Sequence, residues 1–244
     1  MNVPLIVLVT AILMIAIEWV SPGRIFPRTP HWKARALVFN SLQAATSFLG
    51  AVTWDLWLPN FYLLNTASLD FWLQVAIGYL LITFVYYWWH RARHQVPFLW
   101  RWLHQLHHSP ARIEVITSFY KHPLELVVNG LLSSTVLYCL LGLSPSAVVS
   151  VVLITGLAEL FYHWNIKTPF VLGFIFQRPE SHCLHHKKGL HNCNYSDLPV
   201  WDMLFGTFVN PNSDTGSCGF AGLRETKVFL MLCGKNINTR RNLR

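Results

Sequence analysis

Eight histidines occupy three short motifs with regular spacing. The motifs are HRARH, HQLHH and HCLHH, which carry His90 and His94, then His104, His107 and His108, and last His182, His185 and His186. Residues three and four positions apart project from the same face of a helix. Neutral imidazole is a strong ligand for iron, zinc, copper and nickel, and this many ligands exceed what one tetrahedral zinc ion or one facial triad uses. The spacing therefore predicts a site for a pair of metal ions.

The chain that carries these motifs is strongly apolar. Of its 244 residues, 53% are hydrophobic and only 12% are charged, about half the charged fraction of soluble domains. Residues 71–89 form an apolar run of about the 20 residues that a bilayer core requires, and this run ends directly at His90. Further apolar runs cover residues 4–20, 36–58, 124–143 and 146–162. We predict an all-α fold, an integral membrane helical bundle with a histidine-rich helical cap.

The first run and the last two need separate interpretation. Residues 4–20 lack the basic start and the small-residue cleavage site of a signal peptide, which predicts a retained helix. The runs 124–143 and 146–162 meet at GLSPS, where Gly142 and Pro145 break the helix. They form either a full membrane hairpin or a shallower re-entrant pair.

The basic residues indicate which side of the membrane the histidines face. Lys and Arg crowd residues 24–35, 91–121 and 178–244, whereas the connections 59–70 and 142–146 contain none. By the positive-inside rule, the three basic regions share the cytoplasmic side. We therefore predict a multi-pass protein of a bacterial inner membrane or the endoplasmic reticulum, with the histidines facing the cytoplasm. The net charge of +8 fits this topology and anionic lipid, and no nucleic-acid-binding motif accompanies it.

Taken in order, the three motifs resemble the histidine boxes of the membrane-bound di-iron fatty acid hydroxylase and sterol desaturase superfamily. The similarity extends through YKHPLE, FYHWN, RPESHCLHH and NYSDLPVWDMLFGTF, at residues 120–125, 161–165, 178–186 and 194–208. The resemblance implies a cytoplasm-facing di-iron centre and dioxygen-dependent hydroxylation or desaturation of an unactivated lipid C–H bond. One departure is NYS at residues 194–196, where the family often has NYG.

Further residues gain a role through this resemblance. In related enzymes another histidine between the second and third boxes completes the ligand set, and His163 matches it in position. Glu159, one turn earlier, is placed to orient the His163 ring as a hydrogen-bond acceptor. Other candidates for metal-binding or ligand-orienting roles are His122, His191, Asn165 and Asp202. We predict no catalytic side chains beyond the metal ligands and no binding motif for an organic cofactor.

The resemblance also divides the chain and implies partners. We predict an N-terminal transmembrane region at residues 1–70, a di-iron domain at 71–210 and a peripheral C-terminal tail at 211–244. The substrate is then a membrane lipid, such as a sterol, a fatty acyl chain or a related compound. Electrons for the reaction come from a separate protein, either a b-type cytochrome or a ferredoxin with its reductase.

Two other functional classes remain open. A histidine-rich membrane metal transporter predicts polar residues spread through the spans, whereas here the histidines gather on one side. A zinc-dependent membrane hydrolase needs only three protein ligands and one open position. No HExxH motif supports the hydrolase.

Overall fold

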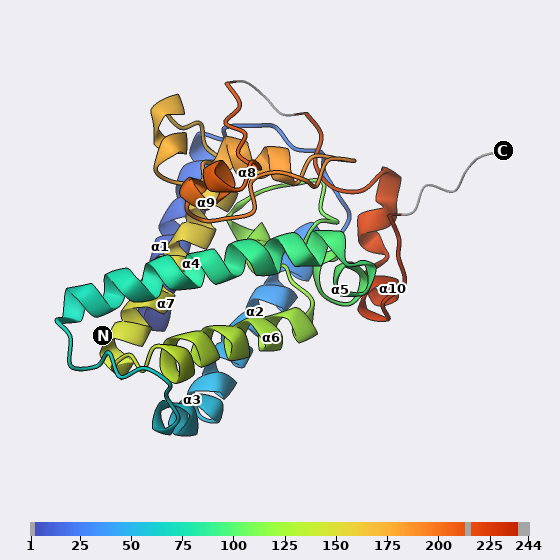
Figure 1. Ribbon diagram of the computed structural model, residues 1–244. Coiled ribbons are helices and arrows are strands. Elements are labelled where there is room, and N and C mark those ends of the chain that lie inside the picture. Colours follow the sequence, from blue (N-terminus) through green and yellow to red (C-terminus); the bar gives the residue numbers. More distant parts are fainter. Residues whose placement is uncertain (1–2, 213–215, 239–244) are drawn as a thin grey trace.

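A computed structural model describes residues 3–212 and 216–238, and no β-strand occurs in these two ranges (Figure 1). The longer helices are α1 (Val3–Val20), α2 (Trp32–Ala51), α4 (Phe71–Gln95), α6 (Pro123–Ser134) and α7 (Pro145–His163). The shorter ones are α3 (Trp54–Trp57), α5 (Pro97–Leu99), α8 (Pro179–His185), α9 (Pro199–Leu204) and α10 (Val228–Leu232). Single 3₁₀ or π turns cover Leu58–Asn60, Trp100–His104, Val115–Thr117, Thr135–Leu140, Phe170–Phe174 and Gly222–Thr226. The predicted all-α fold is confirmed.

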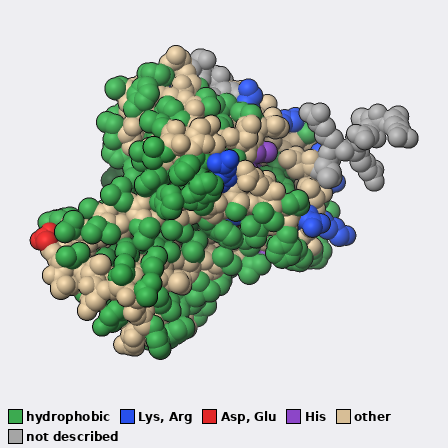
Figure 2. Space-filling model, viewed as in Figure 1, with side chains coloured by type: hydrophobic (Ala, Val, Ile, Leu, Met, Phe, Trp, Pro, Cys, Tyr) green, Lys and Arg blue, Asp and Glu red, His purple; other side chains and the backbone are tan. Residues whose placement is uncertain are grey.

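Four helical segments of the described chain are long and apolar enough to cross a membrane. They are Trp32–Asn60, Phe71–Gln95, Pro123–Leu140 and Pro145–His163, and a shorter apolar helix covers Leu5–Val20. Many Leu, Val, Ile, Phe and Trp side chains of these helices are exposed, and Figure 2 shows their surface as mostly hydrophobic. Such a surface is stable in lipid, where the helices satisfy their own backbone hydrogen bonds. The predicted membrane bundle is confirmed.

Close packing between α4 and α7 fixes the frame of the bundle. Gly78 on α4 faces Leu143 and Val151, and a Cβ atom built at Gly78 would lie 2.8 Å and 2.9 Å from their side chains. Glycine therefore lets the two helices approach to a distance that a larger residue would prevent. Because both helices are rigid, this contact also fixes the separation of His90 and His163 near their far ends.

The connections 59–70 and 142–146, which lack Lys and Arg, lie at the end of the bundle opposite these histidines. Residues 61–70 lead into α4, and Leu63 and Leu64 in this segment pair with the end of the π turn Thr135–Leu140. The N–H of Leu63 donates to the carbonyl of Cys139 at 2.7 Å, and the N–H of Leu64 donates to the carbonyl of Leu140 at 3.1 Å. The C-terminal ends of α4 and α7 therefore lie together at the other end of the bundle.

α4 extends beyond its predicted apolar run, residues 71–89, as far as Gln95. It begins where the Asp70 carboxylate accepts hydrogen bonds from two backbone N–H groups of the first turn. It ends because Val96 precedes Pro97, and the proline ring disfavours helical geometry in the residue before it. The HRARH motif is consequently the last helical stretch of a membrane span.

The apolar run predicted as one helix over residues 36–58 starts earlier in the structure and is interrupted near its end. α2 already begins at Trp32, whose indole Nε1 donates to the Glu114 carboxylate at 2.9 Å. A break at Val52 and Thr53 separates α2 from α3, and the Thr53 backbone is not helical. Both residues at the break are β-branched, which disfavours the helical conformation.

The segment predicted as a peripheral tail, residues 211–244, is packed against the protein over much of its described length. Phe220 and Met231 are buried in one cluster with Trp32 of α2. The isolated helices here are too short to give a periodic signal in the sequence, so only tertiary contacts reveal their position. Part of residues 216–238 is thus packed against α2, while the division of the chain into three regions stays a prediction. The end of the predicted tail lies outside the described residues.

Candidate metal centre

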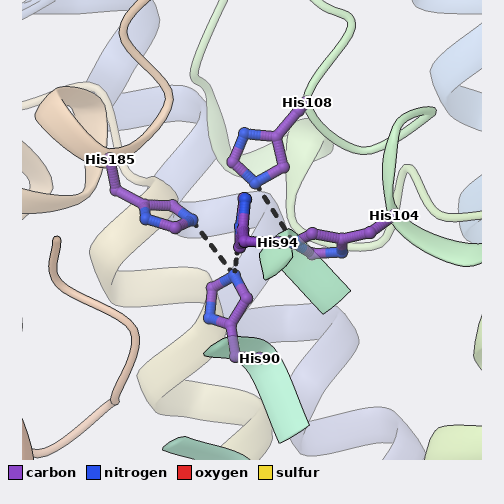
Figure 3. A group of neighbouring side chains, drawn as sticks. All are labelled: His90, His94, His104, His108 and His185. Carbon is purple, nitrogen blue, oxygen red and sulfur yellow. Dashed lines mark hydrogen bonds between the residues drawn. The ribbon is translucent and has the colours of Figure 1, made fainter. Parts of the chain in front are cut away.

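The histidines of the three motifs and the additional candidate between them form two groups at the ends of α4 and α7. The ring nitrogens of the first group lie within 4.8 Å of one another (Figure 3) and belong to His90, His94, His104, His108 and His185. The ring nitrogens of the second group meet the same limit and belong to His107, His163, His182 and His186. All the residues predicted as metal ligands are thus brought together.

Each HxxHH motif contributes to both groups. Neighbouring helical residues point about 100° apart, so His107 turns to the second group while His108 turns to the first. On α8, His185 turns to the first group, whereas His182 and His186 turn to the second. The HQLHH motif lies on a π turn and the tight turn after it, not on the regular helix that we predicted. The two HxxHH motifs therefore contribute ligands to both groups and join them.

The groups are direct neighbours. The rings of His108 and His186, one from each group, stack with centroids 4.0 Å apart and an angle of 11° between their planes. The rings of His104 and His107 also meet across the boundary, with centroids 5.4 Å apart. The groups are therefore the two halves of one centre.

Hydrogen bonds determine which ring nitrogen of the first group is free to bind a metal. His90 Nδ1 lies 2.7 Å from the carbonyl oxygen of Tyr195, and His185 Nδ1 lies 2.7 Å from that of Cys193. A carbonyl only accepts, so both Nδ1 atoms carry the hydrogen and both Nε2 atoms present lone pairs. These Nε2 atoms are 3.0 Å apart (Figure 3). Two lone pairs this close repel each other unless a cation joins them, so the donor set fits a metal ion.

The ring nitrogens of the second group lie as close together as those of the first. His163 Nδ1 donates to the carbonyl of Glu159 at 2.9 Å, which leaves the His163 Nε2 lone pair 3.0 Å from His182 Nε2. His186 Nε2 also lies 3.0 Å from His182 Nε2. Gln177 Nε2 donates to His182 Nδ1 at 2.7 Å and fixes the orientation of that ring, which places the His182 hydrogen on Nε2. A metal ion at His182 Nε2 would shift this hydrogen to Nδ1, with the Gln177 amide turned so that its oxygen accepts. Three ring nitrogens therefore converge, as metal coordination requires.

Protonation of one ring would also remove the repulsion between facing nitrogens, but burial opposes protonation. Burial lowers the pKa of His185 to about 3. It also lowers the pKa of His182 and His186 well below the usual value, and neighbouring histidines act in the same direction. These rings are neutral near pH 7 and keep the lone pairs that a metal ion needs.

A buried carboxylate that we did not predict supports the first group. Glu125, on the first turn of α6, has Oε1 2.9 Å from His104 Nδ1 and forms an ion pair with Arg93. A carboxylate behind a ligand histidine fixes the ring and increases its basicity. The sequence holds a signal for this role, because Glu125 is an acidic residue at the start of an apolar run.

Asp202 acts through the turn that holds His90. Its carboxylate accepts hydrogen bonds from the N–H groups of Tyr195 at 2.8 Å and Ser196 at 2.9 Å. This fixes the carbonyl of Tyr195 against His90. The turn needs a left-handed residue only at Asn194, with φ 55°, which asparagine tolerates. Ser196 lies outside that region, so the chain does not need the glycine that the family often has there.

Glu159 contacts the His163 ring, whereas Asn165 contacts the loop after α1. Glu159 orients His163 through its main-chain carbonyl, while its carboxylate pairs with Lys121. Asn165 binds both backbone polar groups of Arg24, each at 2.9 Å. These two bonds engage both polar atoms of the Asn165 side chain. Asn165 instead ties the loop after α1 to the end of α7.

His122 and His191 lie outside both groups, as far as the described residues show. His122 Nδ1 accepts a hydrogen bond from the N–H of Leu124 at 3.1 Å and so caps α6. The His191 ring stacks beside His94, with centroids 5.7 Å apart, and its Nδ1 lies 3.4 Å from the carbonyl of His185. His122 is a structural residue, whereas His191 borders the first group.

We expect the His122→Ala variant to be less stable but to bind as much metal as the wild type. Loss of a helix cap costs about 0.5–2 kcal/mol, which should lower the unfolding temperature in detergent. Elemental analysis should find unchanged metal, because the ring belongs to neither group. Loss of metal in this variant would show that His122 is a ligand.

Fold and site together define an all-helical membrane protein with a histidine-rich centre at the ends of its spans. The family model for fatty acid hydroxylase matches residues 75–207, which is more than half of the chain and includes both histidine groups. The chain therefore belongs to the fatty acid hydroxylase family.

Several characterised proteins are similar to this part of the chain. An ornithine lipid hydroxylase of Rhizobium tropici is 35% identical, over 60% of this chain and 46% of that protein. A sphingolipid hydroxylase of Schizosaccharomyces pombe is 27% identical, over 58% and 50%. The alkylglycerol monooxygenase of Homo sapiens is 29% identical, over 58% and 31%. The match thus spans half or less of each of these relatives, and no solved structure matches the chain.

Proposed function

We propose that this protein is a membrane di-iron oxygenase that uses dioxygen to hydroxylate or desaturate an unactivated C–H bond of a lipid. The main support is the pair of buried, adjacent imidazole groups whose ring nitrogens converge. Imidazole nitrogen is a suitable ligand for iron. When bound, the iron pair would supply the capacity to activate dioxygen for attack on the C–H bond.

In this proposal each histidine group holds one ion, and the protein keeps the ligands in place. The carbonyls of Tyr195, Cys193 and Glu159 fix the tautomers of three rings, and the Glu125 carboxylate fixes a fourth. Preset ligands need no rearrangement during the reaction. Burial of the centre also keeps bulk water away from reactive species.

The substrate would reach the centre from the bilayer. His90 and His94 lie on the last turns of α4, and His163 ends α7, so the centre adjoins two candidate spans. A lipid chain lying along these helices can approach without leaving the membrane. The names of the relatives, which act on ornithine lipid, sphingolipid and alkylglycerol, also support a lipid substrate.

We place the centre on the cytoplasmic side and assign electron delivery to a separate protein. The positive-inside rule supports the orientation, since Figure 2 shows Lys and Arg side chains around the visible histidine surface. A basic surface of this kind suits an acidic electron donor. A b-type cytochrome or a ferredoxin with its reductase has the required chemistry.

Oxidation of lipids under isotopically labelled dioxygen tests this function. Membranes that contain the wild-type protein, iron and an electron-donor system should form a hydroxylated lipid that carries the label, or a new double bond that requires dioxygen. Membranes with the His185→Ala variant should form neither. Lipids that stay unchanged in the wild type, despite a full complement of iron, would contradict the proposal.

A further inference from the structure

A cavity lies at the start of α2, where the loop after α1 joins that helix. Its volume is about 530 Å³, which is within the usual range of ligand-binding pockets. The residues that line it include Arg28, Thr29, His31, Trp32, Lys33 and Arg112. We call this cavity the basic pocket. Three of its lining residues are lysine or arginine and none is acidic, so the basic pocket suits an anion.

Two of the three cations have no carboxylate partner in the described chain. Arg112 forms an ion pair with Glu114 and donates to the carbonyl of Pro27 at 2.9 Å. Arg28 is exposed and pairs with no described residue. Lys33 places its Nζ 4.6 Å from the centre of the Trp19 ring, a contact that leaves its N–H groups able to donate. Glu114 thus balances Arg112, whereas the charges of Arg28 and Lys33 are not balanced.

The basic pocket also offers hydrogen-bond donors. The hydroxyl oxygen of Thr29 is buried, and it has no hydrogen-bond partner among the described residues. α2 begins at Trp32 without a side-chain cap, so no side chain accepts from the N–H groups of its first turn. The start of a helix carries partial positive charge and attracts phosphate and other oxyanions. Charge and donors together therefore favour a phosphate group as the ligand.

An apolar surface continues directly from the basic pocket. Leu37 lies one turn after Lys33 on α2, so the two side chains project from the same face of the helix. Leu37 and Trp19 are each 69% exposed. α2 is also the first part of the candidate span Trp32–Asn60. The basic pocket thus lies where lipid head groups meet acyl chains, and a phosphate that carries long apolar chains fits both surfaces.

We propose that the basic pocket binds the phosphate of an anionic phospholipid, whose acyl chains lie along α2. Arg28 and Lys33 balance the charge of the phosphate, and the Thr29 hydroxyl donates to one of its oxygens. Basic pockets at the ends of membrane helices recognise head groups of this kind. The inference does not depend on the proposed function, since the residues that line the basic pocket belong to neither histidine group.

Lipid binding to the purified protein in a neutral detergent tests this inference. Dioleoyl phosphatidylglycerol and dioleoyl phosphatidylcholine share their chains and their phosphate, but only the first has a net negative charge. Their affinities follow from the shift that each produces in the unfolding temperature. The wild type should bind phosphatidylglycerol at least about tenfold more tightly, because each unbalanced cation near an anionic head group adds about fivefold. Equal affinity for the two lipids would overturn the proposal.

Inorganic phosphate distinguishes the lipid from a free anion. It shares the charged group but has no acyl chain to cover the exposed side chains of α2. Phosphatidylglycerol should therefore bind at least about 100-fold more tightly than inorganic phosphate. If inorganic phosphate bound as tightly as the lipid, the basic pocket would be a site for a free anion and the proposal would be wrong.

Variants with one charge fewer locate the effect. Arg28→Gln and Lys33→Gln should each lower the affinity for phosphatidylglycerol by about fivefold. The matched control is Arg101→Gln, which removes the same charge from an exposed arginine outside the basic pocket and should leave this affinity unchanged. An equal loss in Arg28→Gln and Arg101→Gln would indicate a general attraction to the basic surface and would overturn the proposal.

The Thr29→Val variant separates lipid binding from folding. Valine matches threonine in shape but lacks the buried hydroxyl that has no partner. Without lipid the variant should therefore unfold at a higher temperature than the wild type. Its affinity for phosphatidylglycerol should nevertheless fall by about tenfold, because a hydrogen bond to a charged group is lost. Unchanged affinity in this variant would contradict the proposed contact between Thr29 and the phosphate.

Discussion

The His185→Ala variant should lose iron from one half of the centre and nearly all lipid oxidation. His185 Nε2 lies 3.0 Å from His90 Nε2, and its ring is held by the carbonyl of Cys193. Its removal opens the first group but leaves the second intact. Elemental analysis should find a fall from about two iron ions per chain to about one. Turnover should fall by more than about 100-fold, because even residues behind a ligand change activity by about 10–100-fold.

Two further variants serve as comparisons for His185→Ala. His186→Ala should remove iron from the second group instead, with a similar loss of turnover. His191→Ala should keep the iron of both groups, since its ring borders the first group without joining it. If His185→Ala and His186→Ala retained full iron, the division of the ligands into two groups would be wrong.

The Arg93→Met variant should be strongly destabilised and bind iron less tightly. Arg93 and Glu125 form an ion pair that is almost completely buried, and Glu125 also contacts His104. Methionine fills most of the space but leaves the carboxylate without its cation, which costs about 3–5 kcal/mol. Glu125, the acceptor of His104, also loses the arginine that holds it in place, so iron affinity should fall by about 10–100-fold. Thermal unfolding in detergent and competition with a chelator measure the two effects.

The double variant Arg93→Met/Glu125→Gln shows whether the loss of stability comes from the unpaired charge or from lost packing. Removing both charges should restore much of the stability, because no unpaired ion remains in the interior. Iron affinity should stay low, since glutamine is a weaker acceptor for His104 than a carboxylate. A cost below about 1 kcal/mol for Arg93→Met alone, as for exposed ion pairs, would show that water reaches the Glu125 carboxylate.

Local sequence signals predict the spans well and their irregularities poorly. The long apolar run of α4 and the proline that follows it define that helix, because burial in lipid depends on composition over many residues. The break at Val52 and Thr53 and the π turn at Trp100–His104 depend on tertiary packing. Packing also decides that Met231 is buried in a segment predicted to be peripheral.

Motif spacing identified the histidines but not their partners. It could not divide them, because the turn after His104 and the short helix α8 determine which ring faces which group. Glu125 was missed because it acts on a histidine that is distant in the chain. Such contacts follow from the fold and have no periodic pattern in the sequence.

Elemental analysis of the wild-type protein, expressed with iron and purified in detergent, tests the proposed centre most directly. The paired histidine groups predict about two iron ions per chain. About one zinc ion per chain would contradict the di-iron centre and favour a zinc-dependent hydrolase. A metal load that does not change when His107 or His185 is replaced by alanine would also contradict it, and would favour a transporter.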